Sequence, residues 1–368
     1  MDEKTVIEGL ESLWKATFGD SSEYISLVFD NYFVPEKAFY IERNEEIVSG
    51  LLGVPYEFAP SDGKRLKGLY LCGLATRKDH RHRGFMSQLI EKANDKAMDA
   101  GYDFTFLIPT DALIRPYYEA RGYVDAFFKI MERYVKGHRF GGEEEEVSVV
   151  AFDGAVKEDV LDFLMQNGDA SYGRQGAYQL VHSRNDWETV LREAIISSDP
   201  VYIGKKGEKM VAMAFTTTED GEITVKKMAV SAREYEKALL GGIASLNPGR
   251  NITVVRDLDE ALSHPSSQLW SPFYAQNNAK TAEYEDVAMV EIPFNQSRNA
   301  YPFGMVRIFD LPSVLKKMGI DSSESLKGYS EKELLHLILR RPAGRQADAL
   351  EQILDLPELS LNMSLMLE

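Results

Sequence analysis

The sequence contains one cysteine, Cys72, among its 368 residues. A framework of disulfides within the chain is therefore impossible, and a zinc site built from cysteines is implausible. Cys72 lies in a strand-like run in which Tyr70 and Leu74 share its face, since side chains alternate along a strand. We therefore expect Cys72 in the hydrophobic core rather than as a catalytic nucleophile.

The sequence also lacks long apolar runs and an excess of positive charge. No apolar run approaches the roughly 20 residues that a membrane helix needs, and the acidic start Met1–Lys4 does not resemble a signal peptide. The net charge of -16 argues against general nucleic-acid binding, which depends on Lys and Arg, and favours cationic partners. We expect a cytoplasmic protein that binds neither nucleic acid nor membrane.

The first part of the chain alternates helical and strand-like patterns. Two amphipathic helices come first, and Asp20 with Glu23 has the spacing of a capping box for the second. Strands are predicted next, then a helix that ends at Gly101, and then a strand, a short helix and a last strand. The predicted strands before that helix cover residues 38–42, 47–58 and 66–76, the helix covers 84–100, and the elements after it cover 103–108, 112–120 and 123–134.

The pair Gly141–Gly142 and the four glutamates after it have the composition of a linker, although a solvated hairpin tip remains the alternative. The segment that follows repeats the order of elements loosely, with Ser231 and Glu234 as a capping box for a helix over 232–246. A further strand and a helix that Leu311–Pro312 opens begin a third segment. We predict three domains, at residues 1–140, 147–295 and 300–368.

The strongest signal is the basic stretch Arg77–Met86, which lies between a predicted strand and a predicted helix. The first N–H groups of a helix lack partners within it, and its N-terminus carries partial positive charge, so a pyrophosphate fits there. Gly84 permits close approach of the backbone, and Arg81 and Arg83 supply charge-assisted hydrogen bonds. The alternative is an exposed basic turn without a ligand. His80 and His82 have no partners at metal-ligand spacing, so no metal site is expected.

The order of elements and the run Arg81–Met86 resemble the GNAT acetyltransferases, whose acetyl-CoA loop has the pattern Q/R-x-x-G-x-G/A; Met86 stands where glycine or alanine is usual. The three-part layout resembles the enhanced-intracellular-survival (Eis) group, and Met305–Pro312 looks like the start of its C-terminal domain. The resemblance implies an α/β (α+β) fold with tandem GNAT-like mixed sheets, a second domain without the loop and a shortened sterol-carrier-like third domain. It also implies a homo-oligomer. The cofactor-binding residues that it implies are Leu74, Ala75, Thr76, Arg81, His82, Arg83, Gly84, Phe85 and Met86.

The run Pro116–Tyr123 is similar to the GNAT pattern Y-x-x-x-G-F/Y, and this similarity makes Tyr118 the general acid. A phenol with a pKa of about 10 is protonated at neutral pH and can donate to a thiolate. Packing on a short helix is the alternative role. In the Eis group the chain's C-terminal carboxylate reaches the active site, which points to the α-carboxylate of Glu368 as the base; Glu57, acting through a water, is the other candidate.

We therefore expect an N-acetyltransferase that moves the acetyl group of acetyl-CoA to a primary amine of a small cationic molecule or basic peptide. A sensor or scaffold that binds acetyl-CoA without turnover is the first alternative, and a lipid carrier in the third domain is the second. Phe33 and Tyr70 are candidates for the wall of the acceptor pocket.

Overall fold

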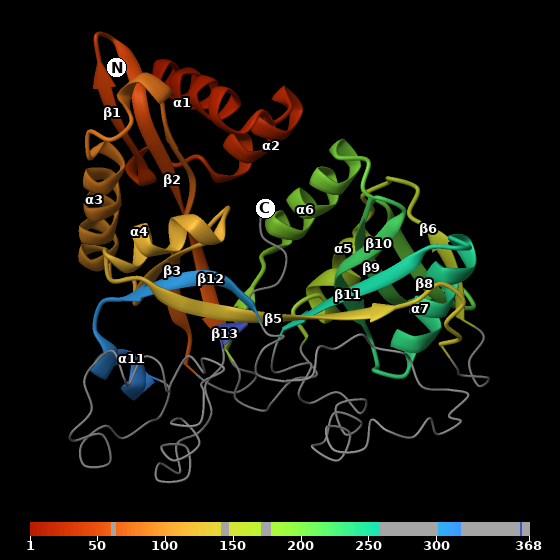
Figure 1. Ribbon diagram of the computed structural model, residues 1–368. Coiled ribbons are helices and arrows are strands. Elements are labelled where there is room, and N and C mark those ends of the chain that lie inside the picture. Colours follow the sequence, from red (N-terminus) through yellow and green to blue (C-terminus); the bar gives the residue numbers. More distant parts are fainter. Residues whose placement is uncertain (60–63, 141–146, 171–177, 258–300, 318–360, 363–368) are drawn as a thin grey trace, which may run out of the picture.

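The computed structural model describes residues 1–59, 64–140, 147–170, 178–257, 301–317 and 361–362. Its first half contains every helix and strand that the sequence predicts up to residue 134 (Figure 1). These elements are α1 (Glu3–Phe18), α2 (Ser22–Tyr32), β1 (Ala38–Arg43), β2 (Glu46–Ala59), β3 (Leu66–Thr76), α3 (Phe85–Asp99), β4 (Phe104–Leu107), α4 (Arg115–Glu119) and β5 (Val124–Tyr134).

Helices α1 and α2 are amphipathic and cover one face of the first sheet. The capping box predicted at Asp20 is wrong, because Ser21 caps α2 by accepting a hydrogen bond from the Tyr24 amide. The Asp20 carboxylate instead accepts a hydrogen bond of 2.7 Å from the Trp14 indole, which fixes the turn between the two helices. In the part of the chain that the structure describes, no helix combines the length and the apolar character needed to cross a bilayer.

The second half repeats the arrangement with a smaller sheet. Strand β7 was not predicted, because its four residues are too few to show a period. Helix α7 begins at Tyr235 without a side-chain cap, so the predicted box of Ser231 and Glu234 is wrong. The elements are β6 (Val147–Ala151), α5 (Glu158–Asn167), β7 (Tyr178–Val181), α6 (Arg184–Ile196), β8 (Val201–Lys206), β9 (Lys209–Glu219), β10 (Glu222–Val230), α7 (Tyr235–Leu246) and β11 (Asn251–Asp257).

Strand β5 joins the two halves into one continuous ladder, in the order β13-β7-β2-β3-β4-β12-β5-β11-β10-β9-β8-β6, with β1 beside β2. The later residues of β5 pair with β11, and its earlier residues pair with β12 (Tyr301–Ile308). Both sheets are mixed, since β3 runs parallel to β4, β10 to β11 and β13 to β7, whereas the other pairs of the described strands are antiparallel. The predicted α/β fold class, with tandem mixed sheets flanked by helices, is confirmed, and the two sheets are joined through β5.

Strand β12 comes from the segment predicted to open the third domain, yet it lies between β4 and β5 of the first half. Met305 and Val306 on this strand are fully buried, and the Arg307 guanidinium forms an ion pair with Glu91 on α3 at 3.0 Å. The predicted helix after it is present as α11 (Leu311–Lys317). Of the remainder of the predicted third domain, the structure describes only β13 (Leu361–Asn362), which runs parallel to β7. The sterol-carrier-like domain therefore stays a prediction.

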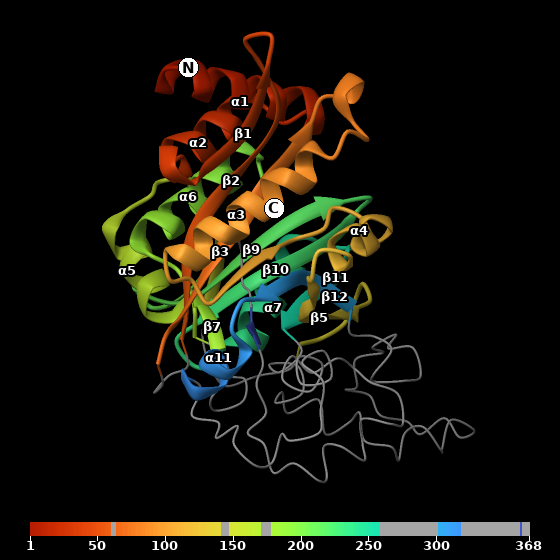
Figure 2. The ribbon, with the colours of Figure 1, turned by 90° about the vertical axis from the view of Figure 1, so that its left-hand side faces the viewer.

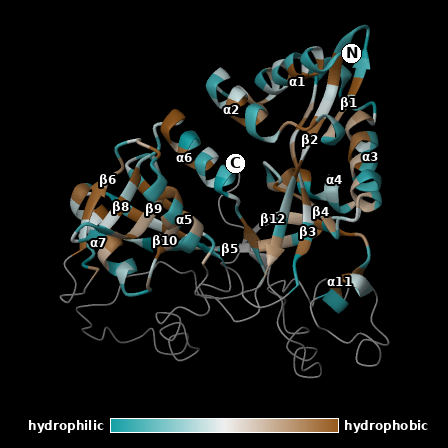
Figure 3. Ribbon diagram, turned by 180° about the vertical axis from the view of Figure 1, so that it is seen from behind, coloured by the Kyte–Doolittle hydropathy of each residue, from teal (hydrophilic) through white to brown (hydrophobic). Residues whose placement is uncertain are grey.

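The first sheet carries helices on both faces (Figures 1 and 2). One face packs against α1 and α2, and α6 of the second half lies beside α2. The other face packs against α3 and α4. In Figure 3, α1, α3 and α6 alternate between hydrophilic and hydrophobic colours, as expected for helices that turn one side to the core. Side chains of a single strand such as β3 therefore reach two separate environments.

The position of β12 predicts that residues 1–140 do not form a stable unit alone. Without β12, the edges of β4 and β5 that it pairs with lose their hydrogen-bond partners, and unpaired edges favour aggregation. We expect a fragment of residues 1–140 to melt at a lower temperature than the full chain in circular dichroism, and to gain stability from an added peptide of residues 299–310. A fragment that melts cooperatively at the temperature of the full chain, with no response to the peptide, would contradict this.

A second prediction concerns Gly73, which has a φ of +61° in β3 and lies against α1. A Cβ atom there would lie 2.3 Å from the Trp14 ring, so Gly73→Ala combines left-handed backbone strain with overpacking. The control is Gly19→Ala, since Gly19 has a φ of +81° and no atom within 4 Å of such a Cβ. We expect Gly19→Ala to lower the free energy of unfolding by about 1–2 kcal/mol and Gly73→Ala by about 1–3 kcal/mol more, measured by urea unfolding. Equal losses would refute the close contact.

Candidate functional site

The loop between β3 and α3 contains two residues with left-handed backbone. After a short 3-10 turn (Lys78–His80), His82 has a φ of 62° and Gly84 a φ of 76°. Backbone of this kind can turn successive N–H groups to one side and so form an anion-binding concavity. Helix α3 follows at Phe85 with no side-chain cap, so its first amides are not bound by a capping side chain. The space around Gly84 is open, because a Cβ atom there would meet nothing within 4 Å.

The arginines of the loop are held in two different ways. Arg77 forms ion pairs with Glu46 on β2 and with Asp79. Arg81 instead donates from Nε to the Thr76 carbonyl at 3.1 Å, and Arg83 donates from one terminal nitrogen to the Asp79 carbonyl at 3.0 Å. A guanidinium carries five N–H donors, so these bonds orient Arg81 and Arg83 while leaving donors for an anion.

The first residues of α3 are fixed by ring contacts and by burial. Phe85 stacks on the ring of His80, with centroids 6.4 Å apart, and the Arg43 guanidinium lies 5.2 Å from the centre of the Phe85 ring. Met86 packs against the buried cluster between α3 and the sheet. These contacts hold the side chains of Phe85 and Met86 in place at the start of α3.

Beside the loop, strands β3 and β4 part. They pair only over Gly68–Tyr70 and Phe104–Phe106, and within the described residues no further pair joins them. Beyond this point Ala75 and Thr76 pair with β2 on their other side. One edge of β3 therefore carries backbone groups that an extended ligand arm can pair with, as an added strand does. We call this place, after Tyr70 and Phe106, the fork.

Tyr118 lies on the α3 side of the sheet. It is buried in the same cluster as Leu71 and Leu107, the first residue of each strand beyond the paired region. Burial is the largest cause that raises the pKa of the Tyr118 hydroxyl well above its ordinary value, followed by its neighbours Tyr117 and Tyr123. The hydroxyl is therefore protonated at any physiological pH and is available only as a donor of its proton.

Two groups of contacts that the sequence did not reveal hold α4 in place. Ser87 on α3 lies 3.2 Å from the Tyr117 hydroxyl and also accepts a hydrogen bond from Arg121, whose guanidinium stacks 3.5 Å from the centre of the Tyr117 ring. Behind them the Tyr123 hydroxyl lies 2.9 Å from the Thr105 hydroxyl. The run Tyr117–Tyr123 thus binds the helix that carries Tyr118 to both α3 and the sheet.

The two candidate bases are not brought to this place by the described residues. Glu57 pairs across β2 and β3 with Lys67 and forms an ion pair with Arg65 on the surface. Lys67 precedes Leu71 by four residues, which corresponds to about 13 Å along a strand, so Glu57 lies away from the fork. Glu368 lies outside the described residues, and its role stays a prediction.

The opposite face of the fork has a polar cluster that joins the two halves. The Tyr32 hydroxyl on α2 is within hydrogen-bonding reach of Tyr56 on β2 and of Asp186 and Thr189 on α6, and burial raises the pKa of both tyrosines. Tyr70, a predicted wall residue, lies on this face, with its ring 5.3 Å from that of Phe106. Phe33, the other, stacks on Phe29 at the end of α2. The cluster was missed because its members come from both halves of the chain.

Cys72 is also on this face, 6% exposed and surrounded by the cluster of α1 and α2. Burial raises the pKa of its thiol to about 12, so the thiolate form is negligible near neutral pH. The expected core position of Cys72 is confirmed.

Comparison with known proteins identifies the domain. The family described as acetyltransferase (GNAT) domain matches residues 3–125. No curated protein matches the chain. Among solved structures, the chain is similar to a probable N-acyltransferase from Enterococcus faecalis V583 (TM-score 0.60, 14% identity, 86% of this chain and 73% of that chain). It is similar to a GCN5-related N-acetyltransferase from Anabaena variabilis (0.61, 13%, 86% and 73%) and to Eis1 from Mycobacterium abscessus (0.59, 14%, 86% and 75%).

At these identities the structural neighbours show the fold, which extends over both halves of the chain, while the family match assigns the part that contains the loop, the fork and Tyr118. Residues 3–125 thus match the model of a GNAT acetyltransferase domain, and the prediction of a GNAT-type acyltransferase enzyme is confirmed at the level of this match.

Proposed function

We propose that the chain transfers the acetyl group of acetyl-CoA to a primary amine of a small cationic molecule or basic peptide. The observation that carries this proposal is the adjacency of three features: an uncapped helix start with two oriented arginines, a strand edge that parts from its neighbour, and a buried tyrosine at the point of parting. These features match, in order, a diphosphate, an extended amide-bearing arm and a thioester.

In this proposal the diphosphate lies against the amides at Gly84–Met86, with Arg81 and Arg83 beside it. Charge-assisted hydrogen bonds from guanidinium to phosphate are short and strong, and the helix start adds its partial positive charge. His82 contributes backbone rather than charge, because its left-handed φ sets the direction of the neighbouring amides. The arm pairs with the free edge of β3 at Leu74, Ala75 and Thr76.

Acetyl transfer forms a C–N bond to the amine and breaks the C–S bond of the thioester. The departing sulfur needs a proton, and Tyr118 is the group at the fork that can donate one. The amine arrives mainly as an ammonium ion, because the pKa of an alkyl amine is about 10.4, and it must lose a proton before it attacks. For that proton, the α-carboxylate of Glu368 is the acceptor that the family resemblance supplies.

The amine has a separate approach from the opposite face of the sheet. Tyr56, Tyr70 and Cys72 face that side, and Asp186 from α6 places a carboxylate near it. The net charge of -16 also favours cationic acceptors. The second half of the chain thereby takes part in the acceptor side of the site, although it lacks a basic loop of its own.

The deciding experiment is a thiol-release assay with acetyl-CoA and a panel of amines that includes diamines, aminoglycoside-type polyamines and lysine-containing peptides. Turnover with cationic amines and none with neutral alcohols supports the proposal. Tight binding of acetyl-CoA without turnover on any amine would favour the sensor or scaffold instead.

The cytoplasmic location and the homo-oligomer stay predictions. Light scattering during size-exclusion chromatography tests the oligomeric state.

Loss of either orienting arginine is expected to weaken CoA binding. A hydrogen bond to a charged group contributes about 1.5–3 kcal/mol, so Arg81→Ala or Arg83→Ala should raise the Kd for CoA by roughly 10- to 100-fold in calorimetry. Arg77→Ala is the matched control, since Arg77 has the same charge in the same loop but is already paired with Glu46 and Asp79. It should change the Kd by about twofold or less. Equal losses for all three would show an unspecific effect of charge.

Removal of the Tyr118 hydroxyl is expected to affect kcat and not binding. Tyr118→Phe should lower kcat by roughly 100-fold or more, which is typical for loss of a general acid, and leave the Kd for CoA unchanged. Tyr117→Phe is the control and should retain most of the activity. Because burial raises the pKa of Tyr118, its donating form persists as pH rises past about 10. Two results together would contradict the environment assigned to Tyr118. The wild-type kcat would fall with an apparent pKa below about 10, and the Tyr118→Phe variant would show no such fall.

A further inference from the structure

The Arg121 guanidinium lies at the start of α3, although Arg121 itself follows α4 in the chain. One of its terminal nitrogens donates to the Ser87 hydroxyl, and the other donates to the Tyr117 carbonyl. Ser87 is the third residue of α3, which begins at Phe85. The Tyr117 ring supports the guanidinium from one side, with its centre 3.5 Å away. These contacts hold Arg121 in one position beside the first turn of the helix.

The backbone amides of this turn come before the hydrogen bonds of the helix. The first of these bonds runs from the Gln88 amide to the Gly84 carbonyl, so the amides of residues 85–87 have no acceptor within α3. In Ser87, only the Cα and Cβ atoms separate such an amide from the hydroxyl that binds Arg121. An acceptor oxygen that binds the Ser87 amide therefore lies close to the guanidinium as well.

The charge of Arg121 lacks a compensating carboxylate. Among the described residues, none forms an ion pair with it, and its Nε–H group is buried without a hydrogen-bond partner. The N-terminus of a helix carries partial positive charge, so a cation beside it is unfavourable unless an anion is also present. A guanidinium has more N–H donors than the two that Ser87 and Tyr117 occupy. The surroundings of Arg121 therefore favour an anion with several acceptor oxygens.

Arg121 is also part of the turn that follows Tyr118. Its amide donates to the Tyr118 carbonyl at 2.8 Å. Burial is the largest cause that raises the pKa of the Tyr118 hydroxyl, and the Arg121 guanidinium acts in the opposite direction, so its charge lies within electrostatic reach of that hydroxyl. A ligand bound to Arg121 is therefore connected, through one residue, to the helix that carries the candidate acid.

We propose that Arg121 is a third guanidinium of the cofactor site and binds the diphosphate of CoA from the side of α4. The inference rests on the proposed function and extends it to a residue outside the β3–α3 loop. Arg81 and Arg83 belong to the loop before α3, whereas Arg121 reaches the first turn of α3 through Ser87. A diphosphate has acceptor oxygens for the free amides and for the guanidinium groups together. When bound, it connects α3 with α4 and steadies the helix that carries Tyr118.

The test is calorimetric titration of the full chain and of its Arg121→Gln variant with CoA and with dephospho-CoA, which keeps the diphosphate but lacks the 3′-phosphate. We expect the substitution to raise the Kd for both ligands by the same factor, roughly tenfold or more. Unchanged Kd values for both ligands would overturn the proposal. A loss confined to CoA would overturn it too, because Arg121 would then contact the 3′-phosphate instead of the diphosphate.

Because Arg121 also anchors α4, a ligand without phosphate separates binding of the anion from support of the fold. Pantetheine has the arm and the thiol of CoA but no phosphate, and NMR titration measures its Kd. Arg121→Gln should leave this Kd unchanged. A merely structural role of Arg121 would weaken the binding of pantetheine and of CoA alike, which would contradict the proposal. Arg121→Lys, which keeps the charge but loses the planar fork, should retain part of the affinity for CoA.

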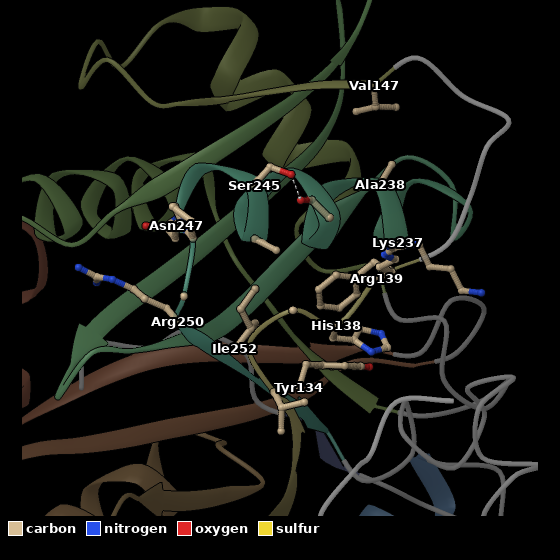
Figure 4. Close-up of a pocket in the computed structure, with 17 residues that line it drawn as sticks. Tyr134, His138, Arg139, Val147, Lys237, Ala238, Ser245, Asn247, Arg250 and Ile252 are labelled. Carbon is tan, nitrogen blue, oxygen red and sulfur yellow. Dashed lines mark hydrogen bonds between the residues drawn. The ribbon is translucent and has the colours of Figure 1, made fainter. Parts of the chain in front are cut away.

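Arg250→Gln is the matched control, and thermal melting confirms that each variant is folded. Arg250 is an exposed arginine that lines a pocket of the second half (Figure 4), and none of the lining residues belongs to the β3–α3 loop, the fork or α4. This variant should bind CoA as the wild type does. A folded wild-type chain that binds no CoA would overturn the proposed function and this inference with it. Binding of CoA without acetylation of any amine would overturn the transfer step alone, and the Kd values would still decide the role of Arg121.

Discussion

The parting of β3 and β4 is the constraint on which the site depends. Once the strands separate after Tyr70 and Phe106, the backbone groups along one edge of β3 lack a neighbouring strand, and such groups are costly unless water or a ligand satisfies them. The loop at Arg77–Phe85 begins where this edge ends, and Tyr118 belongs to the same buried cluster as Leu71 and Leu107, where the edge starts. The start of α3, the free strand edge and Tyr118 are therefore all positioned relative to one strand, β3.

That separation has to be stabilised from outside, because a sheet gains its stability from continuous pairing. Strand β12 closes the far side of β4 and pairs with β5, and its fully buried Met305 lies in the same cluster as Tyr118. The ion pair of Arg307 with Glu91 then connects β12 to α3, the helix whose start holds the loop. A segment distant in sequence, in which Arg307 follows Glu91 by 216 residues, thus supports both the acid and the cofactor end of the proposed site.

Local patterns in the sequence were sufficient for the elements, the loop and the candidate acid. Alternation and helical periodicity located nearly every strand and helix in the described residues, and the glycine and arginines at a strand-to-helix junction pointed to the proposed anion site. What they missed are contacts between distant segments. The insertion of β12, the pairing of β7 with β2 and the cluster of Tyr32 with Asp186 have no local signature, because each residue involved is an ordinary member of its own strand or helix. The capping boxes predicted at Asp20 and at Ser231 are wrong. Ser21 caps α2, and α7 begins without a side-chain cap.

The second half has a mixed sheet without a basic loop, and several of its elements contact the first half. Strand β5 runs through both sheets, β7 extends the edge of β2, and α6 brings Asp186 to Tyr32. In the proposed function, an acceptor that enters from the face of α1 and α2 would meet residues of both halves, and its specificity would depend on how the two halves are placed. The buried Arg256, paired with Glu132 on β5 and Glu236 on α7, holds that placement near the β5–β11 junction. Removal of one member of such a buried group leaves the other charges uncompensated, so breaking the network is expected to be strongly destabilising.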